Sequence, residues 1–144
     1  MERFMALDIG EKRIGIAVSD PFNSYALPVQ TYHRKNLKCD IAYIVNIVKE
    51  KRVTELVCGL PLNLDGTKSQ QTDYTQYFID RLKENLAIPV TTADERCTTV
   101  EAHRVLIEED YSRQKRKQFV DALAATYILE GFLRNKSRNS GQGE

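Results

Sequence analysis

The chain is 144 residues long, a length that favours a single domain. Hydrophobic residues make up 42% and charged residues 28%, close to the averages of globular proteins, so the disordered and fibrous classes are excluded. Lys and Arg total 21 against 20 Asp and Glu, which gives a net charge of +1. A polyanionic partner would therefore have to be bound by local basic patches rather than by the overall charge.

The apolar stretches are too short for a secretion signal or a membrane span. The apolar segment of residues 4–9 is interrupted by Asp8, and no run approaches the ~20 apolar residues that cross a membrane. The three cysteines, Cys39, Cys58 and Cys97, lack C-x-x-C spacing, and with two histidines they form no ligand set for structural zinc. Free thiols indicate a reducing compartment, so we expect a cytoplasmic protein with no membrane partner.

The first part of the chain predicts a meander of three strands. Short apolar runs at residues 3–7 and 14–19 flank a polar turn at residues 10–13, a pattern typical of a β-hairpin. A third strand is expected over residues 25–32, after a turn signal at Asp20 and the proline that follows it.

The rest of the chain alternates between helices and short buried strands. Helices are expected over residues 37–52, 68–86, 99–107 and 117–133, and strands over 55–58 and 89–93. A meander followed by two strand–helix crossovers predicts an α/β fold, a mixed five-stranded sheet with helices on both faces. Right-handed crossovers give the strand order 3-2-1-4-5. We expect one domain over residues 1–133, and a disordered polar tail over 134–144.

Three carboxylates lie near the positions where ligands bind in folds of this kind. Asp8 closes the first strand, Glu95 follows the fifth, and Asp121 borders the apolar stripe of the last helix. Ligands of these sheets bind beyond the carboxyl ends of the parallel strands, so the topology predicts that the three acids share one cleft. Simpler interpretations stay open: Asp8 as a turn cap, Glu95 in a surface ion-pair cluster, and Asp121 as a partner of the helix dipole.

Carboxylates held together repel one another, and hard divalent cations neutralise them. Ligation by oxygen alone suits Mg²⁺ or Mn²⁺. Two such ions about 4 Å apart can activate water and stabilise a leaving oxygen at phosphorus. The three acids therefore predict hydrolysis of phosphodiester bonds.

Four motifs carry a resemblance to a known family. They are DIGEKRIG at residues 8–15, CGLPLNLDGT at 58–67, DERCTTVEA at 94–102 and VDALAA at 120–125. In this order and spacing they resemble the YqgF (RuvX) family, whose members have a ribonuclease-H-like fold. These bacterial proteins were named Holliday junction resolvases and are now mostly described as pre-16S rRNA nucleases acting in ribosome maturation. The resemblance covers residues 3–133, and it departs from the family at Cys97, where an aliphatic residue is usual.

The resemblance implies a hydrolase in which Asp8, Glu95 and Asp121 are the catalytic and metal-binding residues, with two Mg²⁺ or Mn²⁺ ions. It implies 5′-end processing of pre-16S rRNA, with water attacking phosphorus to leave a 5′-phosphate and a 3′-hydroxyl. Two alternatives stay open: a resolvase of Holliday junctions or other branched DNA, and a non-catalytic module that binds nucleic acid or the ribosome. The protein could act as a monomer or a homodimer, with the ribosome or its precursor as a further partner.

Polar and basic side chains near these acids are candidates for binding nucleic acid. They are Lys12 and Arg13 in the first turn, Asn63 and Thr67 after the fourth strand, Arg96 beside Glu95, and the run of Arg113, Lys115, Arg116 and Lys117 before the last helix. The basic run equally suits a solvated charged face. Tyr74, Tyr77 and Phe78 have helical spacing and are interpreted as core or surface residues rather than as base-stacking platforms.

Overall fold

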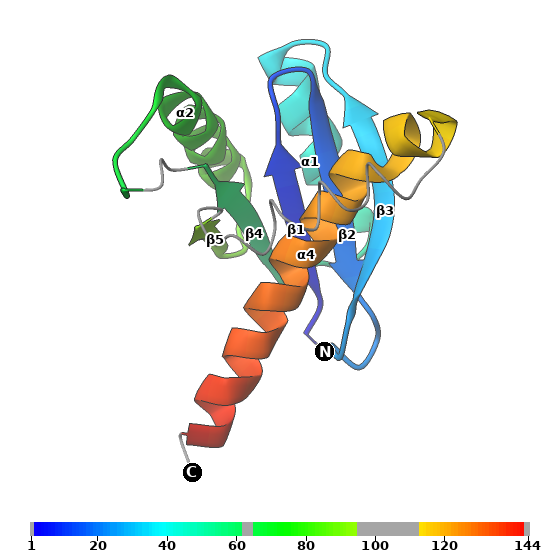
Figure 1. The fold of residues 1–144 in the computed structure, drawn as a ribbon, viewed down its shortest axis with the longest axis vertical. Coiled ribbons are helices and arrows are strands. Elements are labelled where there is room, and N and C mark those ends of the chain that lie inside the picture. The colour runs from blue at the N-terminus through cyan, green and yellow to red at the C-terminus, as the bar shows by residue number, and fades with distance from the viewer. Residues whose placement is uncertain (1, 62–64, 95–112, 143–144) are drawn as a thin grey trace.

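The computed structural model describes residues 2–61, 65–94 and 113–142. Its sheet has five strands in the order β3-β2-β1-β4-β5, as the sequence predicts (Figure 1). The strands are β1 (Phe4–Ile9), β2 (Arg13–Ser19), β3 (Ala26–His33), β4 (Glu55–Leu60) and β5 (Val90–Asp94). The helices are α1 (Leu37–Glu50), α2 (Gln70–Asn85) and α4 (Arg113–Gln142). The helix expected over residues 99–107 lies outside the described residues.

The sheet is mixed, because β1, β2 and β3 form a meander, whereas helical crossovers lead to β4 and β5. β1 is antiparallel to β2, and β2 to β3, whereas β1, β4 and β5 are mutually parallel. Every residue of β1 is buried, because helices cover both faces: α4 packs on one, and α1 and α2 on the other (Figure 1). Burial on both faces explains why this strand is a continuous apolar run broken only by Asp8.

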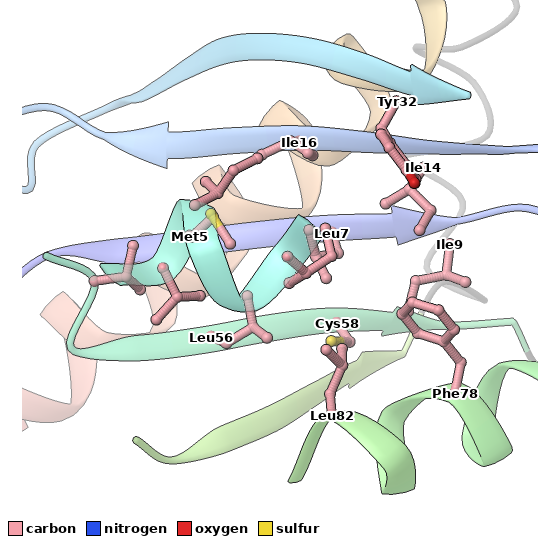
Figure 2. Packing of buried hydrophobic residues seen from close by; sticks show 14 of the residues in the cluster. Met5, Leu7, Ile9, Ile14, Ile16, Tyr32, Leu56, Cys58, Phe78 and Leu82 are labelled. Carbon is pink, nitrogen blue, oxygen red and sulfur yellow. The ribbon is translucent and has the colours of Figure 1, made fainter. Parts of the chain in front are cut away.

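The larger of the two core clusters joins side chains of β1, β2 and β4 to side chains of α1 and α2 (Figure 2). Met5 and Leu7 of β1 pack with Leu56 and Cys58 of β4 and with Leu82 of α2. Burial raises the pKa of the Cys58 thiol to about 12, because an apolar surrounding disfavours the thiolate. This cysteine therefore serves packing rather than chemistry.

The helix α4 packs closely against the opposite face. Ala122, Ala124 and Ala125 are fully buried, and side chains of this size allow the helix backbone to approach the strands. Beyond them, the rings of Phe132 and Phe4 meet edge to face with centroids 5.4 Å apart.

The helix is longer than the sequence predicts. It begins at Arg113 rather than at residue 117, and it continues to Gln142 through the segment expected to be a disordered tail. The Lys136 ammonium lies 5.2 Å from the centroid of the Phe4 ring and 5.8 Å from that of Phe132. A cation over two aromatic rings gives residues beyond Leu133 a contact with the domain that their polar composition does not reveal.

The strand β3 forms one free edge of the sheet and is irregular. Gln30 pairs with Ile16, and Pro28 pairs with Ala17, so Val29 has no partner in the register and forms a bulge. Proline is tolerated here because an edge strand does not need every backbone donor.

Candidate active site

Asp8 lies near the carboxyl end of β1 and is only 9% exposed. Strand side chains alternate between faces, and the residues on either side of it, Leu7 and Ile9, pack toward α1 and α2. Asp8 therefore shares the face of Phe4 and Ala6, which pack with α4. A carboxylate so far removed from water needs hydrogen bonds or a cation to offset its lost hydration.

The turn after Asp8 is tied down by backbone hydrogen bonds. The Gly10 amide donates to the Arg13 carbonyl at 2.8 Å, and the Arg34 amide donates to the Lys12 carbonyl at 2.9 Å. The Arg34 guanidinium also donates from Nη1 to the Gly10 carbonyl at 3.0 Å. Lys12 and Arg13, both predicted to bind nucleic acid, are exposed on this turn.

A buried charge network supports the same turn from α1. Asp40, 1% exposed, accepts hydrogen bonds from Arg34 Nε at 2.9 Å, the Tyr32 hydroxyl at 2.9 Å and the Lys35 amide at 3.0 Å. Burial alone would raise the pKa of Asp40, but the hydrogen bonds from the Lys35 amide, Arg34 and Tyr32 outweigh it and lower that pKa. Burial and the neighbouring Asp40 raise the pKa of Tyr32 to about 12.

This network was not predicted from the sequence, although the sequence carries a signal for it. Asp40 sits inside the apolar stripe of α1, next to the buried Ile41 and Ile44. An acid at a core-facing helical position needs a buried partner, and Arg34 is that partner.

The carboxyl ends of β4 and β5 lie at the same end of the sheet as Asp8. Leu7 pairs with Cys58, and Cys58 pairs with Thr92, so the three strands are in step. Further along, Leu60 pairs with Asp94, the final residue of β5. Neighbouring strands lie about 4.8 Å apart, so the ends of β1 and β5 are separated by about 10 Å.

Several predicted site residues lie outside the described part of the chain. Glu95, Arg96 and Asn63 are among the residues that the structure does not describe. Thr67 is exposed, and its amide and hydroxyl both donate to the Asp65 carboxylate, at 2.9 Å and 2.6 Å. The Thr67 donors therefore stabilise the turn formed by residues 65–67 instead of facing a phosphate. Gly66, in the middle of this turn, has a positive φ of 88°.

The last helix carries the remaining candidates. Arg113, Lys115, Arg116 and Lys117 lie in the first turns of α4, and not before the helix as the sequence analysis expected. Asp121 also lies in α4, four residues before the buried Ala125. The side chains from residue 113 to residue 121 are not among those described.

Of the three carboxylates predicted to bind metal, the structure describes the side chain of Asp8. Its buried carboxylate, near the carboxyl end of a parallel strand, is the oxygen donor that Mg²⁺ or Mn²⁺ prefers. Among the described residues, no three His, Cys, Asp or Glu side chains are grouped closely enough to hold a metal. None of the helices in the described ranges is long and apolar enough to cross a membrane.

Solved structures of similar fold include two resolvases. The chain matches Thermus thermophilus RuvC, solved in complex with a Holliday junction substrate, with a TM-score of 0.60 and 11% identity, covering 94% of this chain and 96% of that one. It matches the Holliday junction resolvase of fowlpox virus with a TM-score of 0.52 and 16% identity, covering 94% and 98%. At these identities the likeness establishes the fold, which is ribonuclease-H-like.

Sequence comparisons are more specific. The model of the RuvX family, described as Holliday junction resolvase, matches residues 2–135. A protein of Clostridium novyi named "Putative pre-16S rRNA nuclease" is 46% identical over 131 residues, which cover 91% of this chain and 97% of the relative. A protein of the same name from Moorella thermoacetica is 44% identical over 137 residues, covering 95% and 98%. The chain therefore belongs to the RuvX family of nucleases, hydrolases of phosphodiester bonds.

Proposed function

We propose that this protein is a divalent-metal-dependent nuclease that processes the 5′ end of pre-16S rRNA in the cytoplasm. The observation that carries the proposal is the buried carboxylate of Asp8, near the end of the central parallel strand and on the face covered by α4. A carboxylate at this point can hold a divalent cation, and bound cations of this kind support phosphodiester hydrolysis. The relatives named as pre-16S rRNA nucleases support RNA as the substrate.

In this proposal Asp8, Glu95 and Asp121 would together hold the divalent cations. Glu95 is the residue that follows Asp94, and β5 ends at the same edge of the sheet as β1. Asp121 lies one helical turn before Ala125, which packs in the same core as Ala6 of β1. Both relations support a common site for the three carboxylates.

The chemistry supplied by divalent cations at such a site is activation of water and stabilisation of the leaving oxygen at phosphorus. The protein's own residues hold and orient the strand. Lys12 and Arg13 extend from the turn just beyond Asp8, where they can contact backbone phosphates on either side of the scissile bond. Arg96, Asn63 and the basic run at the start of α4 (Arg113, Lys115, Arg116 and Lys117) are proposed as further contacts. The products are a 5′-phosphate and a 3′-hydroxyl.

Cleavage of branched DNA is the second candidate function, supported by the description of the family model and by the fold shared with RuvC. Binding without catalysis is the third possibility, and one experiment separates the three.

The experiment measures cleavage of an end-labelled pre-16S 5′-leader RNA and of a four-way DNA junction, with Mn²⁺ or with EDTA. Wild type is compared with Asp8→Asn, which keeps the size of the side chain and removes its charge. Asp80→Asn, the same substitution at an exposed position of α2, is the matched control. We expect RNA cleavage that requires Mn²⁺, survives in Asp80→Asn and disappears in Asp8→Asn.

Other outcomes have definite meanings. Cleavage of the junction alone would assign the protein to recombination rather than to RNA processing. Binding of either substrate without cleavage by the wild type would overturn the catalytic proposal and favour a nucleic-acid-binding module.

A further inference from the structure

A pocket of about 450 Å³ opens at the same end of the sheet as Asp8 but on its other face. Its walls are the β1–β2 turn, the segment of residues 33–37 that joins β3 to α1, and the first turns of α2. Phe78 and Asp40 on its floor border the core formed with α1 and α2, whereas Asp8 faces α4. The pocket is therefore a separate site, and the turn after Asp8 connects the two faces.

The free charges around the pocket are mostly positive. Lys12 and Lys35 are exposed at its rim, against one exposed acid, Glu11. The second acid, Asp40, is neutralised by Arg34 and by the hydrogen bonds of Tyr32 and the Lys35 amide. In a chain whose net charge is only +1, this local excess favours an anionic group such as a phosphate.

Two tyrosines provide an aromatic wall beside these cations. Tyr74 is 43% exposed and Tyr77 is 54% exposed, whereas their neighbour Phe78 is buried. The Arg34 guanidinium lies 5.2 Å from the centroid of the Tyr74 ring and 4.7 Å from that of Phe78, which fixes this wall against the pocket floor. Exposed rings next to lysines are the combination that binds single-stranded nucleic acid, through stacking of a base and pairing with its phosphate.

We propose that this pocket binds one unpaired nucleotide of the RNA substrate, outside the cleavage site. Lys35 holds its phosphate, and Tyr77, with Tyr74 beside it, provides the surface on which its base stacks. The inference rests on the proposed function, because it takes RNA as the ligand. A strand bound in both sites passes around the turn at residues 10–13, so the enzyme selects RNA with an unpaired flank near the cut.

A second copy of the chain is the other occupant that such a surface could have. A two-fold contact centred on the pocket would bring the Lys12 and Lys35 side chains of both copies together, and like charges at an interface oppose association. The charge of the pocket therefore favours a polyanion over a copy of the same surface.

The test measures affinity for a fluorescein-labelled 12-nucleotide single-stranded RNA by fluorescence anisotropy in EDTA, where cleavage does not contribute. Tyr77→Ala is expected to weaken binding about tenfold or more, and Tyr77→Phe to retain it, because the ring and not the hydroxyl stacks. Lys35→Glu is expected to weaken binding and to make it less dependent on salt, because one phosphate contact is lost. The matched controls are Phe22→Ala, which removes an exposed ring between β2 and β3, and Lys49→Glu, which changes the same charge at the far end of α1.

Equal affinity in the pocket variants and the controls would overturn the inference. So would a change of oligomeric state in Tyr77→Ala, measured by light scattering, with unchanged affinity for RNA. Cleavage of RNA by the wild type distinguishes a failure of the pocket inference from a failure of the proposed nuclease function. If the wild type cleaves pre-16S RNA while the pocket variants bind normally, only the pocket is refuted. If the pocket variants lose affinity while the wild type cleaves nothing, the pocket stands as an RNA contact and the catalytic proposal fails.

Discussion

At Gly10 the chain turns from β1 toward β2 with no room for a side chain. A Cβ atom built on this residue would lie 2.8 Å from the Arg13 carbonyl oxygen, closer than carbon and oxygen approach without a clash. The clash involves backbone, so a larger residue must move the turn itself. Because Asp8 is only two residues away, the fit at Gly10 bears on the position of the proposed catalytic carboxylate.

Gly10→Ala should therefore lower the free energy of unfolding by about 1–3 kcal/mol, the usual range for overpacking, and slow RNA cleavage. Gly131→Ala is the matched control, since no atom lies within 4 Å of a Cβ at this position of α4. That control should gain up to about 1 kcal/mol from helix propensity. Urea unfolding checks both values, and equal effects of the two substitutions would show that the turn adapts freely.

Single residues differ in how far the sequence predicts them. Asp8 could be identified because a lone acid in an apolar strand is conspicuous. The pairing of Arg34 with Asp40, and of Arg34 with the Gly10 carbonyl, could not, because these contacts depend on how β3 delivers the chain to α1. Tyr74, Tyr77 and Phe78 were grouped by their helical spacing, but only the packing of α2 buries Phe78 and exposes the two tyrosines.

Among the elements, the start of α1 depends most on charge. The Asn36 side chain accepts a hydrogen bond from the Cys39 amide at 2.9 Å and caps the helix, while Asp40 in the first turn binds Arg34. The lowered pKa of Asp40 means that the folded state holds this carboxylate ionised more strongly than the unfolded chain does. Its stabilising effect is present above the ordinary carboxyl pKa and is lost as the pH falls through the lowered value.

Asp40→Asn should therefore destabilise the protein by about 3 kcal/mol near neutral pH, because it leaves Arg34 buried without its counter-charge. The difference from wild type should begin to shrink once the pH falls below the ordinary carboxyl value of 3.8, where the unfolded chain takes up a proton, and should vanish only below the lowered pKa of the folded state. Urea unfolding at pH 7 and pH 3 measures the difference in the free energy of unfolding between Asp40→Asn and wild type. The exposed-site variant Asp80→Asn should cost little at either pH. A loss in Asp40→Asn that is the same at both pH values would mean that shape, and not charge, supports α1.

Element boundaries were predictable where local pattern decides them. The expected helix over residues 37–52 corresponds to α1 (Leu37–Glu50): the spacing of its apolar residues predicts its start, and the helix ends two residues earlier than expected. The last helix was predicted too short, and the contact of Lys136 with Phe4 joins its later part to a strand more than a hundred residues away in the chain. Contacts of this kind leave no local pattern.

For the whole molecule, topology followed from the handedness of crossovers, and the order of all five strands was correct. The meeting of Asp8, Glu95 and Asp121 stays a prediction, because the side chains of the last two lie outside the described residues. Cation binding tests it without any substrate. A ligand that binds only the folded state stabilises it according to its concentration relative to Kd.

Mn²⁺ at a hundredfold excess over Kd should therefore raise the melting temperature of the wild type by several degrees. The shift should be absent in Asp8→Asn and intact in Asp80→Asn, as followed by circular dichroism or calorimetry. Equal shifts in Asp8→Asn and wild type would place the cation elsewhere and remove Asp8 from the metal site.

The irregular edge at β3 has a consequence for how the protein can associate. An exposed strand normally offers a ladder of backbone donors and acceptors on which another chain can add, the first step toward aggregation. Here Pro28 lacks an amide donor and the bulge at Val29 breaks the spacing, so an incoming strand finds no continuous partner. The sheet does not grow from this side, and any complex involving this side is built from side chains rather than from a shared sheet.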